Sequence, residues 1–254
     1  MIIENCLITA NQQLNKDNYQ MELQAPQIAK AAAFGQFIML KTSETYDPFL
    51  KRPMGISSVF DERIRFIYCL KGRGTELLSQ MLPGSLMEVM GPIGNGWSIP
   101  QKAQKVLVVA GGVGIAPLLD LVKHFFQHKV ACTCLWGLQD KEQLFKVEEL
   151  KLWSDLQVVT EDGSCGEKGY VTLLLPEEPS YDMVYCCGPQ PLMAKVAEWA
   201  EKKQQPCQVS LGERMGCGVG TCMGCVCKIK EGDHQSYKRV CCDGPVFDSR
   251  EVIF

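Results

Sequence analysis

Residues 212–227 read GERMGCGVGTCMGCVC, and this stretch sets the expectation for the whole chain. Cys217, Cys222 and Cys225 follow the order C-x4-C-x2-C, and Cys241 comes later in VCCDGPVF. This spacing is typical of plant-type [2Fe–2S] sites, in which four thiolates hold two irons. The glycines between the thiols allow the backbone to fold closely around a cluster. The sequence therefore predicts a small C-terminal iron–sulfur domain.

Alternatives remain open for the metal and for single cysteines. A structural zinc site also uses C-x2-C pairs, but it usually has two short pairs separated by a spacer, which the C-x4-C step does not provide. Cys242 stands beside Cys241 and competes with it as the fourth ligand. Cys227 alternates with Cys225 at the start of a strand expected over 226–230, so it faces the other side of that strand.

Composition and charge narrow the class of protein. The chain has 254 residues, which suggests about two domains, or two and a small appendix, and its net charge of -3 gives no reason to expect nucleic acid or an anionic membrane as a partner. Its 14 cysteines are irregularly scattered, which indicates a reducing compartment. No secretory signal is visible, and the most apolar stretch, 106–119, is interrupted by glycines and too short to span a bilayer. We expect a cytoplasmic protein.

The first hundred residues have the pattern of an antiparallel β barrel or sandwich. A short helix is expected over 75–81, and β-formers or alternation mark strands over 6–10, 19–23, 37–41, 64–70 and 86–90. Two basic stretches stand out. KRPMGISS at 51–58 suits a phosphate or the edge of a flavin ring, and KGRGT at 71–75 offers amides and a helix N-terminus to an anion. A short basic, glycine-containing stretch of this kind is more often an ordinary turn.

From Lys105 onward the pattern alternates between strands and helices, which is typical of a parallel-sheet nucleotide-binding domain. Gly111, Gly112 and Gly114 follow its first strand, where they allow a pyrophosphate to approach the backbone. GGVGIAP is not G-x-G-x-x-G, and a tight turn without a ligand also explains it. The expected strands are 106–110, 130–136, 157–160 and 183–187, and the expected helices are 117–128, 142–150 and 191–203.

The order of motifs resembles the ferredoxin–NADP reductase superfamily, with Arg-Pro-x-x at 52–55, G-x-G-T at 72–75, GGVGIAPL at 111–118 and CCGPQPLM at 186–193. The tail, MGCGVGTCMGCVCK with VCCDGPVF, is similar to that of the electron-transfer subunits of NAD-dependent, type B dihydroorotate dehydrogenases. This resemblance covers essentially the whole chain. It implies an FAD-binding antiparallel barrel over 1–99, an NAD-binding α/β domain over 100–208 and a [2Fe–2S] domain over 209–254.

The resemblance also implies site residues, position by position. The FAD contacts are Arg52, Pro53, Met54, Gly55 and Ser57, with Gly72, Gly74 and Thr75 near the phosphates. The wall of the NAD site is Gly111, Gly112, Gly114 and Pro117, with Cys187, Gly188 and Pro189 near the nicotinamide. The cluster ligands are Cys217, Cys222, Cys225 and Cys241. One departure is Gly55, where the superfamily usually has serine, and either Ser57 or a backbone amide is the candidate to replace its hydrogen bond.

This cofactor set suits electron conversion, because NADH gives up two electrons as a hydride, a [2Fe–2S] cluster accepts one at a time, and a flavin does both. No general base is expected. The resemblance implies an FMN-containing catalytic partner, two copies of each subunit, and electron flow from dihydroorotate through FMN, cluster and FAD to NAD+ in pyrimidine biosynthesis. The alternatives are the small subunit of another flavin and iron–sulfur NAD(P)H oxidoreductase, or a cluster-based redox sensor, although no DNA-reading helix is visible.

The expected preference for NAD over NADP rests on the second strand of the nucleotide domain, which ends near Trp136 and continues GLQDKEQ. Asp140 in this segment would repel a 2′-phosphate, and the segment offers no arginine to receive one. Lys141 stands beside it and weakens the argument. The resemblance supports the same choice, so we expect NAD as the substrate.

Overall fold

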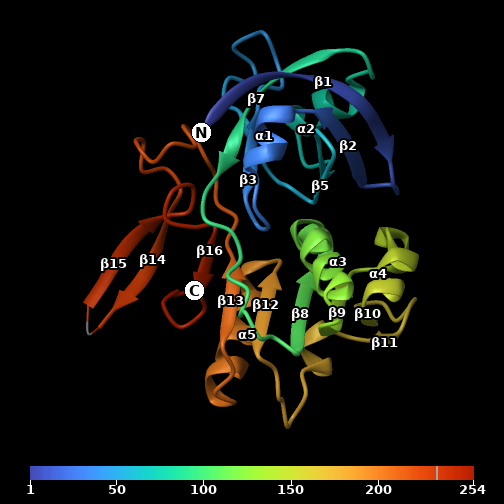
Figure 1. Ribbon diagram of the computed structural model, residues 1–254, viewed down its shortest axis with the longest axis vertical. Coiled ribbons are helices and arrows are strands. Elements are labelled where there is room, and N and C mark those ends of the chain that lie inside the picture. Colours follow the sequence, from blue (N-terminus) through green and yellow to red (C-terminus); the bar gives the residue numbers. More distant parts are fainter. Residues whose placement is uncertain (233) are drawn as a thin grey trace.

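The computed structural model describes residues 1–232 and 234–254. It has three parts: an antiparallel seven-stranded sheet, a second seven-stranded sheet with helices against it, and a projecting two-stranded hairpin (Figure 1). The first sheet lies at the top of the view and the second below it. The predicted fold class is confirmed. Among the described residues, no helix is long and apolar enough to cross a membrane.

The antiparallel sheet forms an open barrel with the strand order β4-β3-β7-β1-β2-β6-β5. Its long strands alternate buried and exposed side chains, so that Cys6 and Ile8 of β1 face the core while Ile3 and Leu7 face outward. Two short helices accompany it, α1 (Pro26–Ala31) and α2 (Arg73–Gln80). The strands are β1 (Ile2–Gln13), β2 (Asn18–Gln24), β3 (Phe37–Leu40), β4 (Arg52–Gly55), β5 (Ser58–Phe60), β6 (Arg63–Cys69) and β7 (Leu86–Ile93).

The nucleotide domain has the strand order β11-β10-β9-β8-β12-β13-β16. All its neighbours pair in parallel except β16, and the order reverses between β8 and β12. In open α/β sheets, ligands bind beyond the carboxyl ends of the strands at such a reversal. The strands are β8 (Lys105–Gly111), β9 (Ala131–Leu138), β10 (Asp155–Thr160), β11 (Glu167–Lys168), β12 (Met183–Cys187), β13 (Cys207–Ser210) and β16 (Val246–Asp248).

Two helices of this domain differ from their predicted bounds. The helix expected over 117–128 begins as a 3-10 turn, η1 (Gly112–Leu118), and becomes α-helical only in α3 (Leu119–Gln127). The helix expected over 142–150 is wrong: η2 (Lys141–Gln143) ends early, and α4 (Val147–Trp153) starts after Lys146. Lys146 has a φ of 54°, a left-handed conformation that interrupts a right-handed helix. The remaining elements are η3 (Val171–Leu174) and α5 (Gln190–Lys202).

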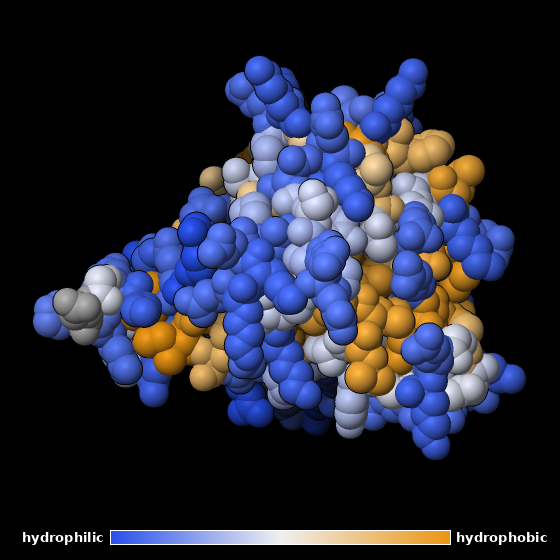
Figure 2. All heavy atoms as spheres, turned by 90° about the horizontal axis from the view of Figure 1, so that it is seen from below, coloured by the Kyte–Doolittle hydropathy of each residue, from blue (hydrophilic) through white to orange (hydrophobic). Residues whose placement is uncertain are grey.

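The C-terminal part is tied to both other parts. Its hairpin, β14 (Val226–Glu231) and β15 (His234–Arg239), projects from the molecule, as Figure 2 shows from below. The chain then returns as β16, which pairs antiparallel with β13, and β13 itself crosses the predicted boundary at 208/209. One hydrophobic core includes Met39 and Met90 of the barrel, strand residues of the nucleotide domain, and Cys225 and Cys241. The three parts are therefore packed as one unit.

Candidate functional site

A cavity of about 1150 Å³ lies between the barrel and the carboxyl ends of the parallel strands. Residues from all three parts of the chain line it, including Leu211 and Pro245 from the C-terminal part. It brings together two groups of predicted site residues, one from β4 of the barrel and one from β8, η1 and β12 of the nucleotide domain. These are Pro53, Met54, Gly55, Gly111, Gly112, Gly114, Pro117, Cys187, Gly188 and Pro189.

Close backbone packing explains the glycines along this wall. A Cβ on Gly55 would lie 3.1 Å from Pro117 Cβ, so β4 meets η1 at this point. A Cβ on Gly114 would lie 2.5 Å from the carbonyl oxygen of Cys187, which leaves no room for a side chain between η1 and the end of β12. Gly112, with a φ of 55° and nothing within 4 Å of a Cβ, is the glycine that faces open space. The sequence pattern predicts that all three glycines of GGVG let a pyrophosphate approach the backbone, whereas in the structure the three glycines have different surroundings.

The indole of Trp136 binds the backbone of the glycine-rich turn. Its Nε1 donates a hydrogen bond to the carbonyl of Gly112 at 2.9 Å, and its ring is fully buried in β9. A buried indole N–H normally has such a partner. Cys187 closes the other side of the turn, and burial raises the pKa of its thiol to about 12. The thiol is therefore protonated at neutral pH and presents a neutral surface to the cavity.

The other predicted flavin contacts lie apart from this wall. Among the described residues, the five outside the lining are Arg52, Ser57, Gly72, Gly74 and Thr75. The guanidinium of Arg52 packs on the backbone of Gly74, so β4 and the start of α2 are in contact. Thr75 Oγ1 accepts hydrogen bonds from the amides of Lys71 (2.9 Å) and Gly72 (3.3 Å), which occupies two amides expected to face an anion. Ser57 is fully buried and donates to the carbonyl of Arg65 at 3.0 Å.

Sequence reasoning missed several lining residues. Cys69, the last residue of β6, lines the cavity with Leu70 and Lys71, which follow it, and with Asp17 and Asn18. Asn18 pairs with Cys69 in the β2–β6 ladder, so the two segments reach the cavity side by side. The available signal was the basic turn after a strand, but strand pairing between distant segments is invisible in a single sequence. The lining also includes Ser210, Gly212, Glu213 and Met215, which connect the cavity to the cysteine-rich loop.

The cysteine-rich loop directs its amides at sulfur atoms. Cys217 Sγ accepts hydrogen bonds from the amides of Val219 and Cys222, both at 3.4 Å. These bonds, above all the one from Val219, lower the pKa of Cys217 to about 6. The thiol is therefore largely ionised at neutral pH, and the thiolate is the form that binds metal. Cys222 Sγ in turn accepts from the amide of Gly224 at 3.4 Å, and Cys222 is exposed.

A second pair of cysteines lies inside the molecule. Cys225 and Cys241 are 3% and 1% exposed, and the amide of Cys241 donates to Cys225 Sγ at 3.4 Å. Burial, together with the neighbouring thiols of Cys225 and Cys242, raises the pKa of Cys241 to about 12. Bound iron would offset that repulsion by drawing thiolates together. The described residues include no group of three or more metal-binding side chains around one position; the cysteines lie as two pairs, 217 with 222 and 225 with 241.

Arg239 and Gly220 hold the loop in this shape. The guanidinium of Arg239 makes a two-pronged ion pair with Asp243, at 3.0 and 3.2 Å, and donates to the carbonyl of Gly220 at 3.2 Å. Gly220 has a φ of 79°, and a Cβ there would collide with Cys242 Sγ. Cys242 Sγ itself lies 3.6 Å from Cys241 Sγ. The donors, the glycines and the thiol pairs together fit a binuclear iron–sulfur cluster.

The cysteine pairs are close to the cavity along the chain. Cys241 and the cavity-lining Pro245 are separated by four peptide units, which limits their Cα distance to roughly 14 Å. Asn95 of the barrel fixes this connection, because its side chain donates to the carbonyls of Cys242 (3.2 Å) and Asp243 (3.1 Å). Gly218 packs on Met39 and Met90, so the loop also rests on β3 and β7.

Known proteins agree with this arrangement. The iron–sulfur cluster binding domain of dihydroorotate dehydrogenase B matches residues 212–253, and the oxidoreductase NAD-binding domain matches 108–198. The chain is 40% identical, over 97% of each chain, to the dihydroorotate dehydrogenase B (NAD+) electron transfer subunit of Caldanaerobacter subterraneus subsp. tengcongensis. It is 36% identical, over 98% of each chain, to the corresponding subunit of Geobacillus sp. WCH70.

A solved structure has the same fold over nearly the whole length. It comes from work on flavin-based electron bifurcation by NADH-dependent reduced ferredoxin–NADP oxidoreductase. Its chain superposes with a TM-score of 0.87 at 28% identity and covers 98% of this chain and 89% of its own. The family expected from the motifs is thus confirmed. The chain belongs to the electron transfer subunits of dihydroorotate dehydrogenase B (NAD+), and so to a family of oxidoreductase subunits.

Proposed function

We propose that this subunit carries electrons between NAD, at the cavity, and a catalytic partner subunit that oxidises dihydroorotate to orotate in pyrimidine biosynthesis. FAD and a [2Fe–2S] cluster are its cofactors, and NAD is its substrate. One observation supports this proposal above the others: the cavity joins β4 of the barrel to the glycine-rich turn, and its wall at Pro245 is four residues from Cys241. A flavin supplies the chemistry that converts a two-electron hydride into single electrons.

The chain's own residues would hold and orient these groups. Pro53, Met54 and Gly55 offer a backbone edge and apolar surface to one ring, with the turn at Gly112 and the neutral Cys187 opposite. Holding two rings against each other in this way favours hydride transfer by orientation, without a general base. Arg52 and Gly74, in contact beside α2, are the proposed neighbours of the flavin phosphates, with Gly72 and Thr75. Ser57 remains a proposed contact.

The cluster would be held as two iron sites. Cys217 and Cys222 form one ligand pair and Cys225 and Cys241 the other, because each pair is joined by an amide-to-sulfur bond. Four thiolates shared by two irons give two thiolates each. The first pair includes the exposed Cys222 and the second pair is buried in the core, so the first pair would hold its iron nearer to the surface than the second. We keep Cys242 outside the ligand set.

The partner would dock over the exposed side of the cysteine-rich loop. Cys222 is exposed, and two apolar side chains of the same loop, Val219 (40% exposed) and Met223 (52%), lie beside it. Ile3, 62% exposed, belongs to the same side, since it pairs with Met90, on which the loop packs through Gly218. Exposed apolar groups gathered around a redox centre suit a protein interface. We propose an FMN-containing partner, two copies of each subunit, and a cytoplasmic complex, in keeping with the 14 free cysteines.

A second candidate has a specific observation in its favour. The match at a TM-score of 0.87 is to a chain from an NADH-dependent reduced ferredoxin–NADP oxidoreductase, so the same fold occurs in an oxidoreductase of another name. Two features bear on the choice. The tail after Val240 follows the pattern of the dihydroorotate dehydrogenase B domain over 212–253, and the curated relatives cover nearly all of this chain. We therefore rank this candidate second.

The test is reconstitution with the partner. The purified subunit is mixed with the FMN-containing dihydroorotate dehydrogenase subunit of the same cell, and NAD+ reduction is followed at 340 nm with dihydroorotate as the donor. We expect dihydroorotate-dependent NADH formation that neither subunit supports alone. Absence of NADH formation, with flavin and iron present in both subunits, would reject the assignment. NADPH formation from reduced ferredoxin and NADH, with no response to dihydroorotate, would favour the second candidate.

A further inference from the structure

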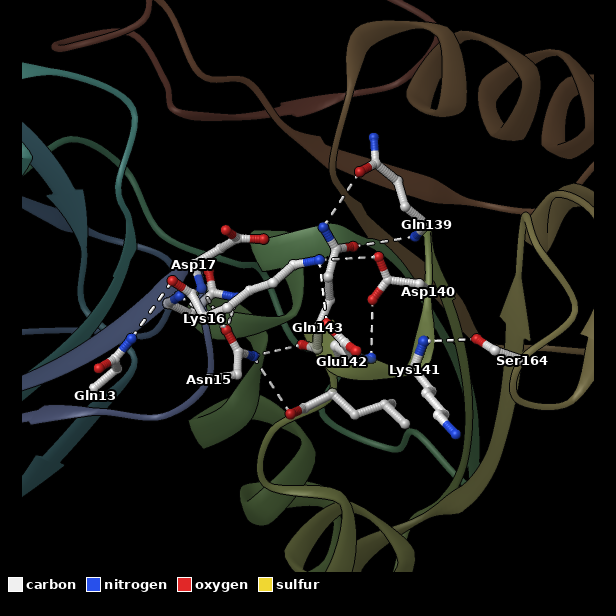
Figure 3. Close-up of polar contacts among 12 residues, drawn as sticks. Gln13, Asn15, Lys16, Asp17, Gln139, Asp140, Lys141, Glu142, Gln143 and Ser164 are labelled. Carbon is white, nitrogen blue, oxygen red and sulfur yellow. Dashed lines mark hydrogen bonds and ion pairs between the residues drawn. The ribbon is translucent and has the colours of Figure 1, made fainter.

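The tip of the β1–β2 hairpin reaches from the barrel to the nucleotide domain. Figure 3 shows this region, where residues 15–18 lie against the segment 139–144 that follows β9. β9 is the second strand of the parallel sheet, next to β8, and the segment after such a strand faces the ribose near the adenine in dinucleotide-binding domains. Gln139 and Gln143 of this segment line the cavity. The barrel thus contacts the part of the site that would meet adenosine.

Asn15 makes the central contacts. Its Nδ2 donates to the carbonyls of Gln143 (2.9 Å) and Leu144 (3.4 Å) across the domain boundary. Its Oδ1 accepts from the amides of Asp17 (3.1 Å) and Asn18 (2.9 Å) within the hairpin. The donors on one side and the acceptors on the other fix the orientation of the amide. One side chain therefore closes the hairpin turn and, with its other end, holds the segment after β9.

The same contacts arrange the groups that face the cavity. The side chain of Gln143 accepts from the amide of Gln139 at 3.1 Å and donates to its side-chain oxygen at 3.4 Å, so the two glutamines form a pair. Asn18 donates to Asn15 Oδ1 at 3.1 Å, and its own Oδ1 is buried with no hydrogen-bond partner among the described residues. Asn18 lines the cavity and is 4% exposed. The hairpin thus orders polar groups toward a ligand.

Asp140, the residue expected to discriminate against a 2′-phosphate, is turned away. Its carboxylate accepts from the amide of Glu142 at 2.9 Å and pairs with Lys16 Nζ at 3.4 Å, and it is outside the described lining of the cavity. Glu161, at the end of the neighbouring β10, is in the lining. The acidic residues that line the cavity on this side are therefore Asp17 and Glu161, and Asp140 serves the contact between the domains.

We propose that Asn15 is a positioning residue for NAD: it holds the segment 139–144 so that Gln139 and Gln143 bind the adenosine half of the dinucleotide. This inference rests on the proposed use of NAD and adds to it a residue of the flavin barrel. The barrel would then act at both ends of the dinucleotide, through the flavin held at β4 beside the nicotinamide and through the hairpin at the adenosine.

The variant Asn15→Asp distinguishes the two sets of hydrogen bonds that this side chain makes. A carboxylate still accepts from the amides of Asp17 and Asn18, so the hairpin turn is kept, but it no longer donates to Gln143 and Leu144. Gln12→Ala, an exposed change in the same hairpin, is the matched control. We expect Asn15→Asp to weaken binding of ADP-ribose and to raise the KM for NADH by about tenfold, the value of one to two lost hydrogen bonds, with kcat and flavin content unchanged.

The assay avoids the partner subunit. ADP-ribose binding is measured by calorimetry, and ferricyanide reduction is followed with NADH or with reduced nicotinamide mononucleotide, which has no adenosine. The proposal requires that the variant lose efficiency with NADH and keep it with the mononucleotide. Equal losses with both donors, or unchanged ADP-ribose binding in Asn15→Asp, would overturn it. Because neither readout uses dihydroorotate, failure of the proposed partner leaves this test intact.

Discussion

Asp120 gives the most quantitative prediction, because it joins the two domains that form the cavity. It lies in α3 of the nucleotide domain, and its carboxylate accepts from the hydroxyl of Ser58 and from the amide of Val59, both at 2.7 Å. Ser58 and Val59 belong to β5 of the barrel. Substitution by alanine removes both acceptors and leaves a hydroxyl and an amide at the interface without partners.

The size of the effect follows from these two bonds. A hydrogen bond to a charged group contributes about 1.5–3 kcal/mol, and burial of the carboxylate, which raises its pKa, offsets part of this gain. We expect Asp120→Ala to lower the free energy of unfolding by about 3 kcal/mol. For a chain of this size, about 2–4 °C of melting temperature corresponds to 1 kcal/mol, so the midpoint should fall by roughly 6–12 °C.

A double-mutant cycle separates the interface bond from other effects. Urea unfolding is measured for the wild type, Asp120→Ala, Ser58→Ala and the double variant. We expect a coupling energy of about 1–2 kcal/mol between the two side chains, since they share a direct bond. Strict additivity of the single changes, or a loss below about 0.5 kcal/mol for Asp120→Ala, would refute the reasoning.

The effect of the same carboxylate on the free energy of unfolding depends on pH. Burial is the main cause that raises the pKa of Asp120, so the folded state binds the proton more tightly than the unfolded state does. The proton-linked part of its contribution to stability is then fully present below the unfolded pKa of about 4 and is lost as pH rises through the raised folded value, while the bonds from Ser58 and Val59 remain. Relative to Asp120→Asn, the wild type should lose stability over this range of rising pH. An opposite slope in unfolding free energies would contradict the assignment.

Three further predictions concern the loop and the glycine-rich turn. Cys241→Ser should lose most of the iron while Cys242→Ser keeps about two irons per chain, measured by iron and sulfide assay; equal retention in both variants would remove Cys241 from the ligand set. Gly220→Ala should destabilise the loop by about 1–2 kcal/mol or more, because the φ of 79° at this position is unfavourable for alanine and the added Cβ would collide with Cys242 Sγ. Normal cluster content together with an unchanged melting temperature would count against this prediction. Gly114→Ala should raise the KM for NADH and leave the flavin content unchanged, since the added Cβ would lie 2.5 Å from the carbonyl oxygen of Cys187 and would displace the backbone there. An unchanged KM would show that the site tolerates this displacement.

Local sequence patterns were sufficient to predict much of the fold. The apolar runs of β8 and β12, the glycines after β8 and the cysteine spacing are each contained in a few consecutive residues, and the predicted architecture followed from them. The prediction of a helix over 142–150 was wrong because of the backbone conformation of one residue. The left-handed Lys146 breaks that segment, although lysine favours helices in general.

Long-range pairing accounts for what the sequence did not reveal. β16 returns to pair with β13 and makes the C-terminal part share a sheet with the nucleotide domain. Asp140 was expected to face the ligand, yet Lys16, more than a hundred residues earlier, binds its carboxylate. Likewise, Asn18 and Cys69 reach the cavity through a strand pairing. Such contacts depend on tertiary structure, which no local pattern encodes.

The most direct test of the account is an anaerobic titration of the isolated subunit with NADH. Visible spectra follow the flavin, and EPR follows the cluster, after iron, sulfide and flavin have been assayed. The account predicts that NADH bleaches the flavin and produces the rhombic signal of a reduced [2Fe–2S] cluster in the same sample. A cluster that stays oxidised while the bound flavin is fully reduced would contradict electron transfer between the cavity and the cysteine-rich loop.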